Sequence, residues 1–75
     1  MKHPVVEALQ TSRLIADIRR VVAILNSDIA AEEEQARVSD PRLPEYPLLA
    51  RALVTRRDNL EATLASLEKR VRELA

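Results

Sequence analysis

Apolar residues recur with the period of an α-helix over two long stretches of the chain, about 4–38 and about 46–74. When successive residues are placed 100° apart, the main apolar residues of the first stretch fall within an arc of about 120°. Those of the second cover only about 80°, which is the narrower stripe of a coiled-coil seam. The broad arc consists of Leu14, Ile15, Ile18, Val21, Val22, Leu25 and Ile29, and the narrow stripe of Leu49, Leu53, Leu60, Leu64, Leu67, Val71 and Leu74.

Between the two stretches lies the proline-rich segment "SDPRLPEYP". Each proline lacks a backbone N–H and disfavours helix in the residue before it, so one continuous helix cannot cross this segment. Proline is well tolerated in a first turn, so Pro4 can open the first helix and Pro44 or Pro47 the second. A connection this short favours antiparallel neighbours. The pattern predicts an all-α fold of one domain, 1–75, with helix 1 at about 4–38, a hinge at 39–47 and helix 2 at about 46–74.

Some local features remain open within this hairpin. Thr11 and Ser12 both favour helix caps, so helix 1 could break there, and the order of residues 1–11 is left undecided. Tyr46 continues the apolar stripe of helix 2 and is predicted to fill the hinge end of the hairpin. His3, next to the N-terminus, is interpreted as a mobile terminal residue.

The chain is too short to be stabilised easily by its own core. Seventy-five residues bury little surface, and such domains usually depend on disulfides, a metal or oligomerisation. There is no cysteine and only one histidine, which leaves oligomerisation. We therefore expect a homodimer that forms a four-helix bundle, with a tetramer and either direction of protomer pairing left open. The predicted interface is Leu14, Ile18, Val21, Val22, Leu25, Ile29, Leu53, Leu60, Leu64, Leu67, Val71 and Leu74.

Leucine occupies every seventh position in helix 2, at 53, 60, 67 and 74. A parallel coiled coil is the main alternative arrangement, with Ala50, Arg57, Leu64 and Val71 in the a positions and Arg56 close to Glu61 of a partner. A basic-zipper protein would need an uninterrupted basic helix before these leucines. The proline-rich hinge breaks any such helix, so the leucines are interpreted as a bundle seam.

Two arginines, Arg56 and Arg57, stand where the seam of helix 2 should be apolar. A charge at a seam is tolerated if it reaches solvent or meets a carboxylate. In a hairpin that turns near Arg42, Arg57 comes level with Asp28 by the equal rise of two helices. We therefore predict a polar layer, within one chain or across the dimer, formed by Arg57 with Asp28 or Glu32. Such a layer would set the register of the helices.

Helix 1 carries a second, weaker apolar stripe that is offset from its main arc. A lone hairpin would leave this stripe in water. It is predicted to be a docking surface for another protein, formed by Val6, Leu9, Ala16, Ala23 and Ile24.

No arrangement of residues points to catalysis or to a metal. Glu32, Glu33 and Glu34 are consecutive, so they point about 100° apart on a helix and cannot converge on one ion. No histidine follows them at the spacing of di-iron bundles, and they are interpreted as a solvated acidic turn. The chain has no glycine and therefore no phosphate-binding loop of the common types. The sequence predicts a non-enzyme without a metal or another cofactor.

Charge composition narrows the choice of partners. Twelve basic residues balance twelve acidic ones, so no net field attracts nucleic acid or anionic lipid. No apolar run approaches the roughly 20 residues of a membrane span, and the start of the chain lacks the apolar core of a secretory signal. We expect a cytoplasmic homo-oligomeric scaffold, adaptor or small chaperone-like protein that binds another protein. The alternative is a nucleic-acid-associated regulator that uses the arginines of helix 2: Arg51, Arg56, Arg57, Arg70 and Arg72.

Overall fold

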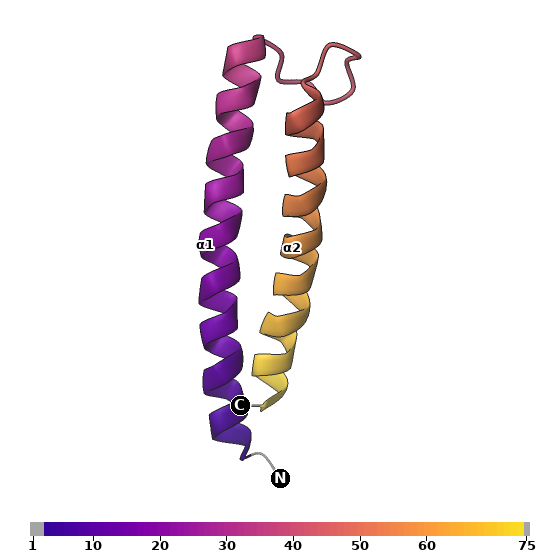
Figure 1. Cartoon of the computed structure of the whole chain (residues 1–75). Coiled ribbons are helices and arrows are strands. Elements are labelled where there is room, and N and C mark those ends of the chain that lie inside the picture. The colour runs from indigo at the N-terminus through magenta and orange to yellow at the C-terminus, as the bar shows by residue number, and fades with distance from the viewer. Residues whose placement is uncertain (1–2, 75) are drawn as a thin grey trace.

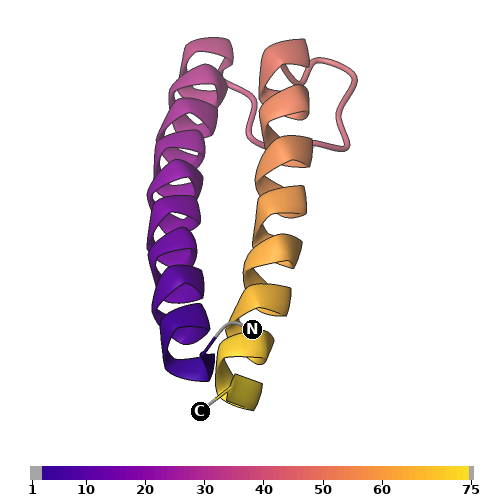
Figure 2. The ribbon, with the colours of Figure 1, turned by 60° about the horizontal axis from the view of Figure 1, so that its bottom comes forward.

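The computed structural model describes residues 3–74, which form two long helices packed side by side (Figure 1). Helix α1 spans Pro4–Ala36 and helix α2 spans Leu48–Leu74. The first turns of α1 lie beside the last turns of α2 in both views (Figures 1 and 2), so the helices are antiparallel. The predicted all-α helical hairpin is confirmed, and each helix boundary at the hinge lies two residues from its predicted position.

Helix α1 is capped at both ends by local contacts. At its start, the Nδ1 atom of His3 accepts a hydrogen bond of 3.2 Å from the backbone N–H of Val5, and Pro4 follows as the first helical residue. His3 is therefore an N-cap, and its interpretation as a mobile terminal residue was wrong. The helix continues through Thr11 and Ser12 without a break.

At its other end, α1 terminates with a residue in the left-handed conformation. Arg37 has φ 57° and ψ 35°. Its N–H donates to the carbonyl of Glu34, and the N–H of Val38 donates to that of Glu33, each over 3.2 Å. This pair of bonds is the Schellman motif, in which glycine usually takes the left-handed position. Because the chain has no glycine, an arginine takes it instead.

The hinge between the helices is an ordered pair of turns. The N–H of Leu43 donates to the carbonyl of Asp40 and the N–H of Tyr46 to that of Leu43, both over 3.1 Å. Pro47 immediately precedes α2, and its carbonyl accepts the first bond of that helix, from the N–H of Arg51. Of the two prolines predicted to open the second helix, Pro47 is the one beside its start.

The two helices meet along residues spaced alternately three and four apart, which is coiled-coil spacing. The side of α1 facing α2 includes the buried Ile15, Leu25 and Ile29, with Ile18 and Val22 half-buried between them. The seam of α2 has one buried residue, Ala50, followed by half-buried Leu53, Arg57, Leu60, Leu64, Leu67, Val71 and Leu74. Leu49 was predicted in this stripe but is 55% exposed, because Ala50 takes the seam position at this turn.

The core of the hairpin is small. Among residues 3–74, five hydrophobic residues are buried: Ile15, Leu25, Ile29, Tyr46 and Ala50. The accessible surface is 5725 Å², whereas a compact monomer of this mass would expose about 4,700 Å². The radius of gyration is 16.2 Å, against about 11 Å for a compact chain of this length. Two helices side by side leave much of their surface in water.

Candidate functional site

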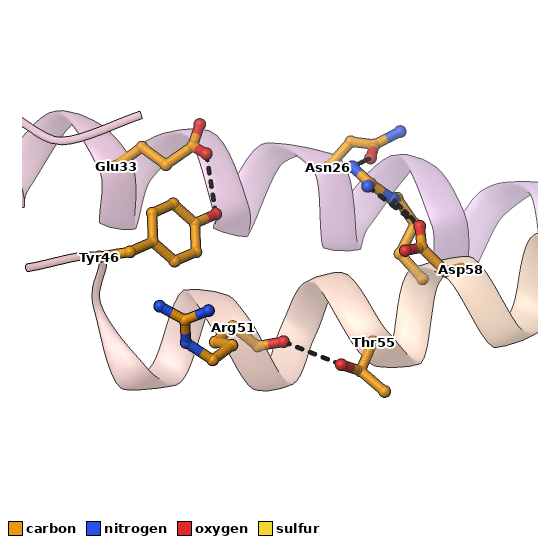
Figure 3. A network of polar contacts seen from close by, with 7 residues as sticks. Asn26, Glu33, Tyr46, Arg51, Thr55 and Asp58 are labelled. Carbon is orange, nitrogen blue, oxygen red and sulfur yellow. Dashed lines mark hydrogen bonds and ion pairs between the residues drawn. The ribbon is translucent and has the colours of Figure 1, made fainter. Parts of the chain in front are cut away.

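Arg57 occupies a seam position of α2 and finds its polar partners beside it. One guanidinium N–H donates to Oδ1 of Asn26 on α1 over 3.1 Å. Two others donate to Oδ1 of Asp58, over 3.2 and 3.1 Å. Figure 3 shows Asn26 and Asp58 on the two facing helices. The side chain is 27% exposed, so its stem lies along the seam while its charged end reaches the rim.

This geometry changes the partners of the predicted polar layer. Within the hairpin, Arg57 is held by Asn26 and Asp58 rather than by the predicted Asp28 or Glu32. Asp28 is exposed and Glu32 is half-buried. A layer that joins Arg57 to Asp28 or Glu32 of a second chain stays a prediction. Asn26 was missed because the sequence argument looked for carboxylates, although an amide oxygen also accepts from a guanidinium.

Tyr46 connects the hinge to the last turns of α1. Its ring is only 4% exposed, and its hydroxyl donates to Oε2 of Glu33 over 2.8 Å (Figure 3). Burial raises the pKa of Tyr46, and the bond to Glu33 raises it further. The predicted burial of Tyr46 is confirmed. Glu33 departs from its interpretation as part of a solvated acidic turn, because it is half-buried and bonded to this hydroxyl.

Arg51 holds the hinge in place from the first turn of α2. Its guanidinium donates to the carbonyl oxygens of Pro41 and Leu43 over 2.9 and 3.3 Å. The same group lies 5.4 Å from the centre of the Tyr46 ring, within the range of a cation–π interaction. The guanidinium of Arg51 therefore bonds to two hinge carbonyls at once and holds the turns against α2.

Two ion pairs tie the helices together near their free ends. Arg70 donates to Oε1 of Glu7, and Arg19 lies 3.5 Å from Oε1 of Glu68. The bond to Glu7 raises the pKa of Arg70. In each pair the arginine is exposed and the glutamate is half-buried, so each pair contributes little to stability. Both pairs join α1 to α2.

Most of the predicted interface residues lie in the seam between α1 and α2 of the same chain. Leu25 and Ile29 are buried there, and the others are half-buried except two. These two are Leu14 and Val21, which are 47% and 37% exposed on the flank of α1. The broad arc of α1 is thus covered by α2 over only part of its width.

The predicted docking stripe of α1 lies in solvent. Val6, Leu9 and Ile24 are 49%, 61% and 54% exposed, and Ala16 and Ala23 are exposed as well. A second group of exposed apolar residues stands at the hinge end, where Leu43, Leu48 and Leu49 are 44%, 82% and 55% exposed. Beyond Leu49, the described part of α2 has no exposed large apolar residue. The unpartnered apolar surface therefore belongs mainly to α1.

A shallow groove near the free ends is lined by Ser12, Ile15, Arg19, Glu68, Val71 and Arg72, but Arg19 and Glu68 are already paired across it. Within residues 3–74, no three histidine or carboxylate side chains gather in a way that could hold a metal ion. In the same residues, neither helix has an apolar stretch that could cross a membrane.

The polar contacts described above join parts of the hairpin to one another. Among residues 3–74, the exposed large apolar residues lie on α1 and near the hinge. Comparison with known proteins adds no further assignment: no family model matches the chain, and no curated protein or solved structure is significantly similar to it.

Proposed function

We propose that this protein is a non-enzymatic scaffold or adaptor that associates with itself and binds another protein. The observation that supports this proposal is the mismatch between the small core of the hairpin and its exposed apolar surface. Among residues 3–74, only five hydrophobic residues are buried, whereas nine large hydrophobic residues are exposed. An excess of this kind on a small helical protein marks an interaction surface.

A homodimer that forms a four-helix bundle is the simplest assembly that would cover this surface. The hairpin exposes about 1,000 Å² more than a compact monomer of its mass would. A typical protein interface removes about 800 Å² from each partner. One additional hairpin would therefore bring the exposed surface close to that of a compact protein. A cytoplasmic location is part of this proposal.

The part of α1 that remains free after self-association would receive the second protein. Its candidate surface is the docking stripe apart from Ile24, that is Val6, Leu9, Ala16 and Ala23, which combines two larger apolar residues with two alanines. Small side chains let a partner helix approach closely, and the larger ones anchor it.

Three of the arginines that the nucleic-acid alternative would use are already hydrogen-bonded within the hairpin, which weakens that alternative. Arg51 holds the hinge, Arg57 bonds to Asn26, and Arg70 bonds to Glu7. Binding to phosphates would require these groups to leave their partners. Duplex DNA titrated at two salt concentrations tests the point, because phosphate contacts give an affinity that falls steeply with salt. A strong salt-dependent affinity would favour the alternative.

The test of self-association is the mass of the protein by light scattering over a wide concentration range. A mass of two hairpins is expected, and the mass of one hairpin at every concentration would contradict the proposal. For the second protein, wild type and a variant with Val6→Glu and Leu9→Glu would be used as matched baits, because both residues lie outside the self-association surface. The proposal expects the same protein to be captured repeatedly by the wild type and lost with the variant.

A further inference from the structure

Exposed residues on the flank of α1 repeat with the same spacing as the seam. We call this set the outer stripe: Leu14, Asp17, Val21, Ile24 and Asp28, spaced three and four residues apart. Its apolar members are 47%, 37% and 54% exposed in chain order. A row with this spacing is suited to pack along another helix.

The sign of the charge differs between the two ends of the outer stripe. Asp28 stands at one end, and Arg13 stands beside Leu14 at the other end, about 22 Å away along the helix axis. Both are exposed, and within residues 3–74 neither makes an ion pair or a side-chain hydrogen bond. Asp17, in the middle, is already paired with Arg20 over 3.0 Å. The stripe therefore has Asp28 at one end and Arg13 beside the other end, with apolar residues and the paired Asp17 between them.

We propose that the outer stripe binds a second copy of this chain, with the two α1 helices antiparallel about a two-fold axis near Arg19. The inference rests on the proposed self-association and specifies its geometry. In this pairing, residues whose numbers add to about 38 lie level. Leu14 then packs against Ile24 of the partner, and Val21 lies beside Asp17 of the partner.

The antiparallel direction follows from the charges. Arg13 of the partner comes within about three residues, or about 4.5 Å, of the level of Asp28. Side chains on a helix tilt toward its N-terminus, so in antiparallel helices these two tilt toward each other. A parallel pairing in register would instead place Asp28 against Asp28 and Asp17 against Asp17. Like charges directly opposite each other oppose association.

The occupant is a second copy because the stripe is complementary to itself. A two-fold axis forms the Arg13–Asp28 contact twice from a single chain type. In a four-helix bundle built on this α1 pair, the two α2 helices flank the pair, and the described part of α2 beyond Leu49 has no exposed large apolar residue that would need its own partner. The hairpin as a whole exposes about 1,000 Å² more than a compact monomer of its mass would, and a stable dimer needs about 800 Å² buried on each partner.

The test uses charge reversal and mixing, followed by sedimentation at low salt. Asp28→Arg alone and Arg13→Asp alone should each raise the dimer dissociation constant roughly tenfold or more, because symmetry repeats each like-charge contact twice. An equimolar mixture of the two variants should recover near wild-type affinity, since the mixed dimer has both contacts with opposite charges. Within one chain the two residues are too far apart to interact, so recovery reports a contact between chains.

The controls reverse a charge on the other helix. Glu61→Arg and Lys69→Asp make the same charge changes at exposed positions of α2 and should leave dimerisation within about threefold of wild type. Circular dichroism would be used to check that each variant is still helical. Variants that dimerise as well as wild type, or a mixture that shows no recovery, would overturn the antiparallel pairing while leaving the proposed function intact. A monomeric wild type would overturn both.

A distance measurement gives an independent check that needs no disrupted contact. The chain has no cysteine, so Gln35→Cys provides a single site for a spin label. The antiparallel pairing places the two labels about 48 Å apart by helical rise. Parallel α1 helices would place them within roughly 20 Å, the width of two helices. The long distance supports the proposal and the short one refutes it.

Discussion

The single tyrosine of the chain gives the hinge a chemical reporter. Burial and the bond to Glu33 raise the pKa of Tyr46, so the folded protein holds the phenolic proton more tightly than the unfolded chain. The stability that this contributes is complete below the ordinary value of about 10. It is lost as the pH rises through the folded-state pKa.

We therefore expect Tyr46→Phe to remove part of the alkaline destabilisation. At neutral pH the variant should lose about 1 kcal/mol, the net contribution of one hydrogen bond. The difference between wild type and variant should shrink above pH 10, because the unfolded wild-type chain loses its phenolic proton there while the folded protein still holds it, which favours unfolding of wild type. Urea unfolding at several pH values measures this difference. With no tryptophan in the chain, absorbance of the tyrosinate gives the pKa directly. A pKa at or below the ordinary value would contradict the expectation.

We expect Arg57 to lower the stability of the hairpin and, in return, to fix the register of the two helices. Arg57→Leu should raise the free energy of unfolding by about 1 kcal/mol, because leucine buries more apolar surface in the seam. It should also broaden the distribution of oligomers, since a slip of one heptad would no longer strand a charge among leucines. Denaturation and sedimentation measure the two effects, with Asn26→Ala as a control that removes only the partner. Unfolding of Arg57→Leu would show that the arginine has another role.

The left-handed backbone conformation of Arg37 at the end of α1 lowers the stability of the hairpin. A side chain with a Cβ atom in the left-handed region costs about 1 kcal/mol relative to glycine. Arg37→Gly should therefore stabilise the hairpin by about this amount, while Arg37→Ala should change little. Thermal unfolding of the two variants at one protein concentration provides the comparison. Equal midpoints would mean that the arginine side chain offsets its own strain.

The hinge is held to the first turn of α2 by the side chain of Arg51. Arg51→Ala removes two bonds to hinge carbonyls and the contact with the Tyr46 ring. A loss of about 2 kcal/mol is expected, with faster hydrogen exchange at the hinge amides. Arg56→Ala is the matched control, since Arg56 is exposed and lies outside the hinge contacts. Equal effects of the two variants would exclude the fastening role.

The helices themselves were predictable because their periodicity and prolines are local signals. The 100° projection located the buried faces of α1 and α2, and Pro4 and Pro47 mark the starts of the two helices. The same projection wrongly included Leu49 in the stripe and left out Ala50, because the half-buried seam of α2 follows a repeat of 3.5 residues and drifts relative to a straight helix. The polar partners Asn26 and Glu33 could not be assigned from one sequence, because they depend on the register set by packing.

At the scale of the whole molecule, folding and association should be coupled. The lone hairpin has a core of five buried residues, and a second copy would cover more of α1. The thermal midpoint should therefore rise with protein concentration, as expected when the native state is an assembly. Calorimetry or circular dichroism over a hundredfold range of concentration measures this dependence. A midpoint independent of concentration would indicate that the hairpin is stable alone.

The placement of the helix ends has a mechanical consequence. Because the start of α1 and the end of α2 lie together, a pull on both ends would peel the helices apart like a zipper. The Glu7–Arg70 pair would separate first, then one layer of seam residues after another, and the hinge with Tyr46 would open last. Each step breaks few contacts, so the hairpin would yield at low force. We therefore expect the hairpin to withstand a higher pulling force when another chain is bound along its two helices.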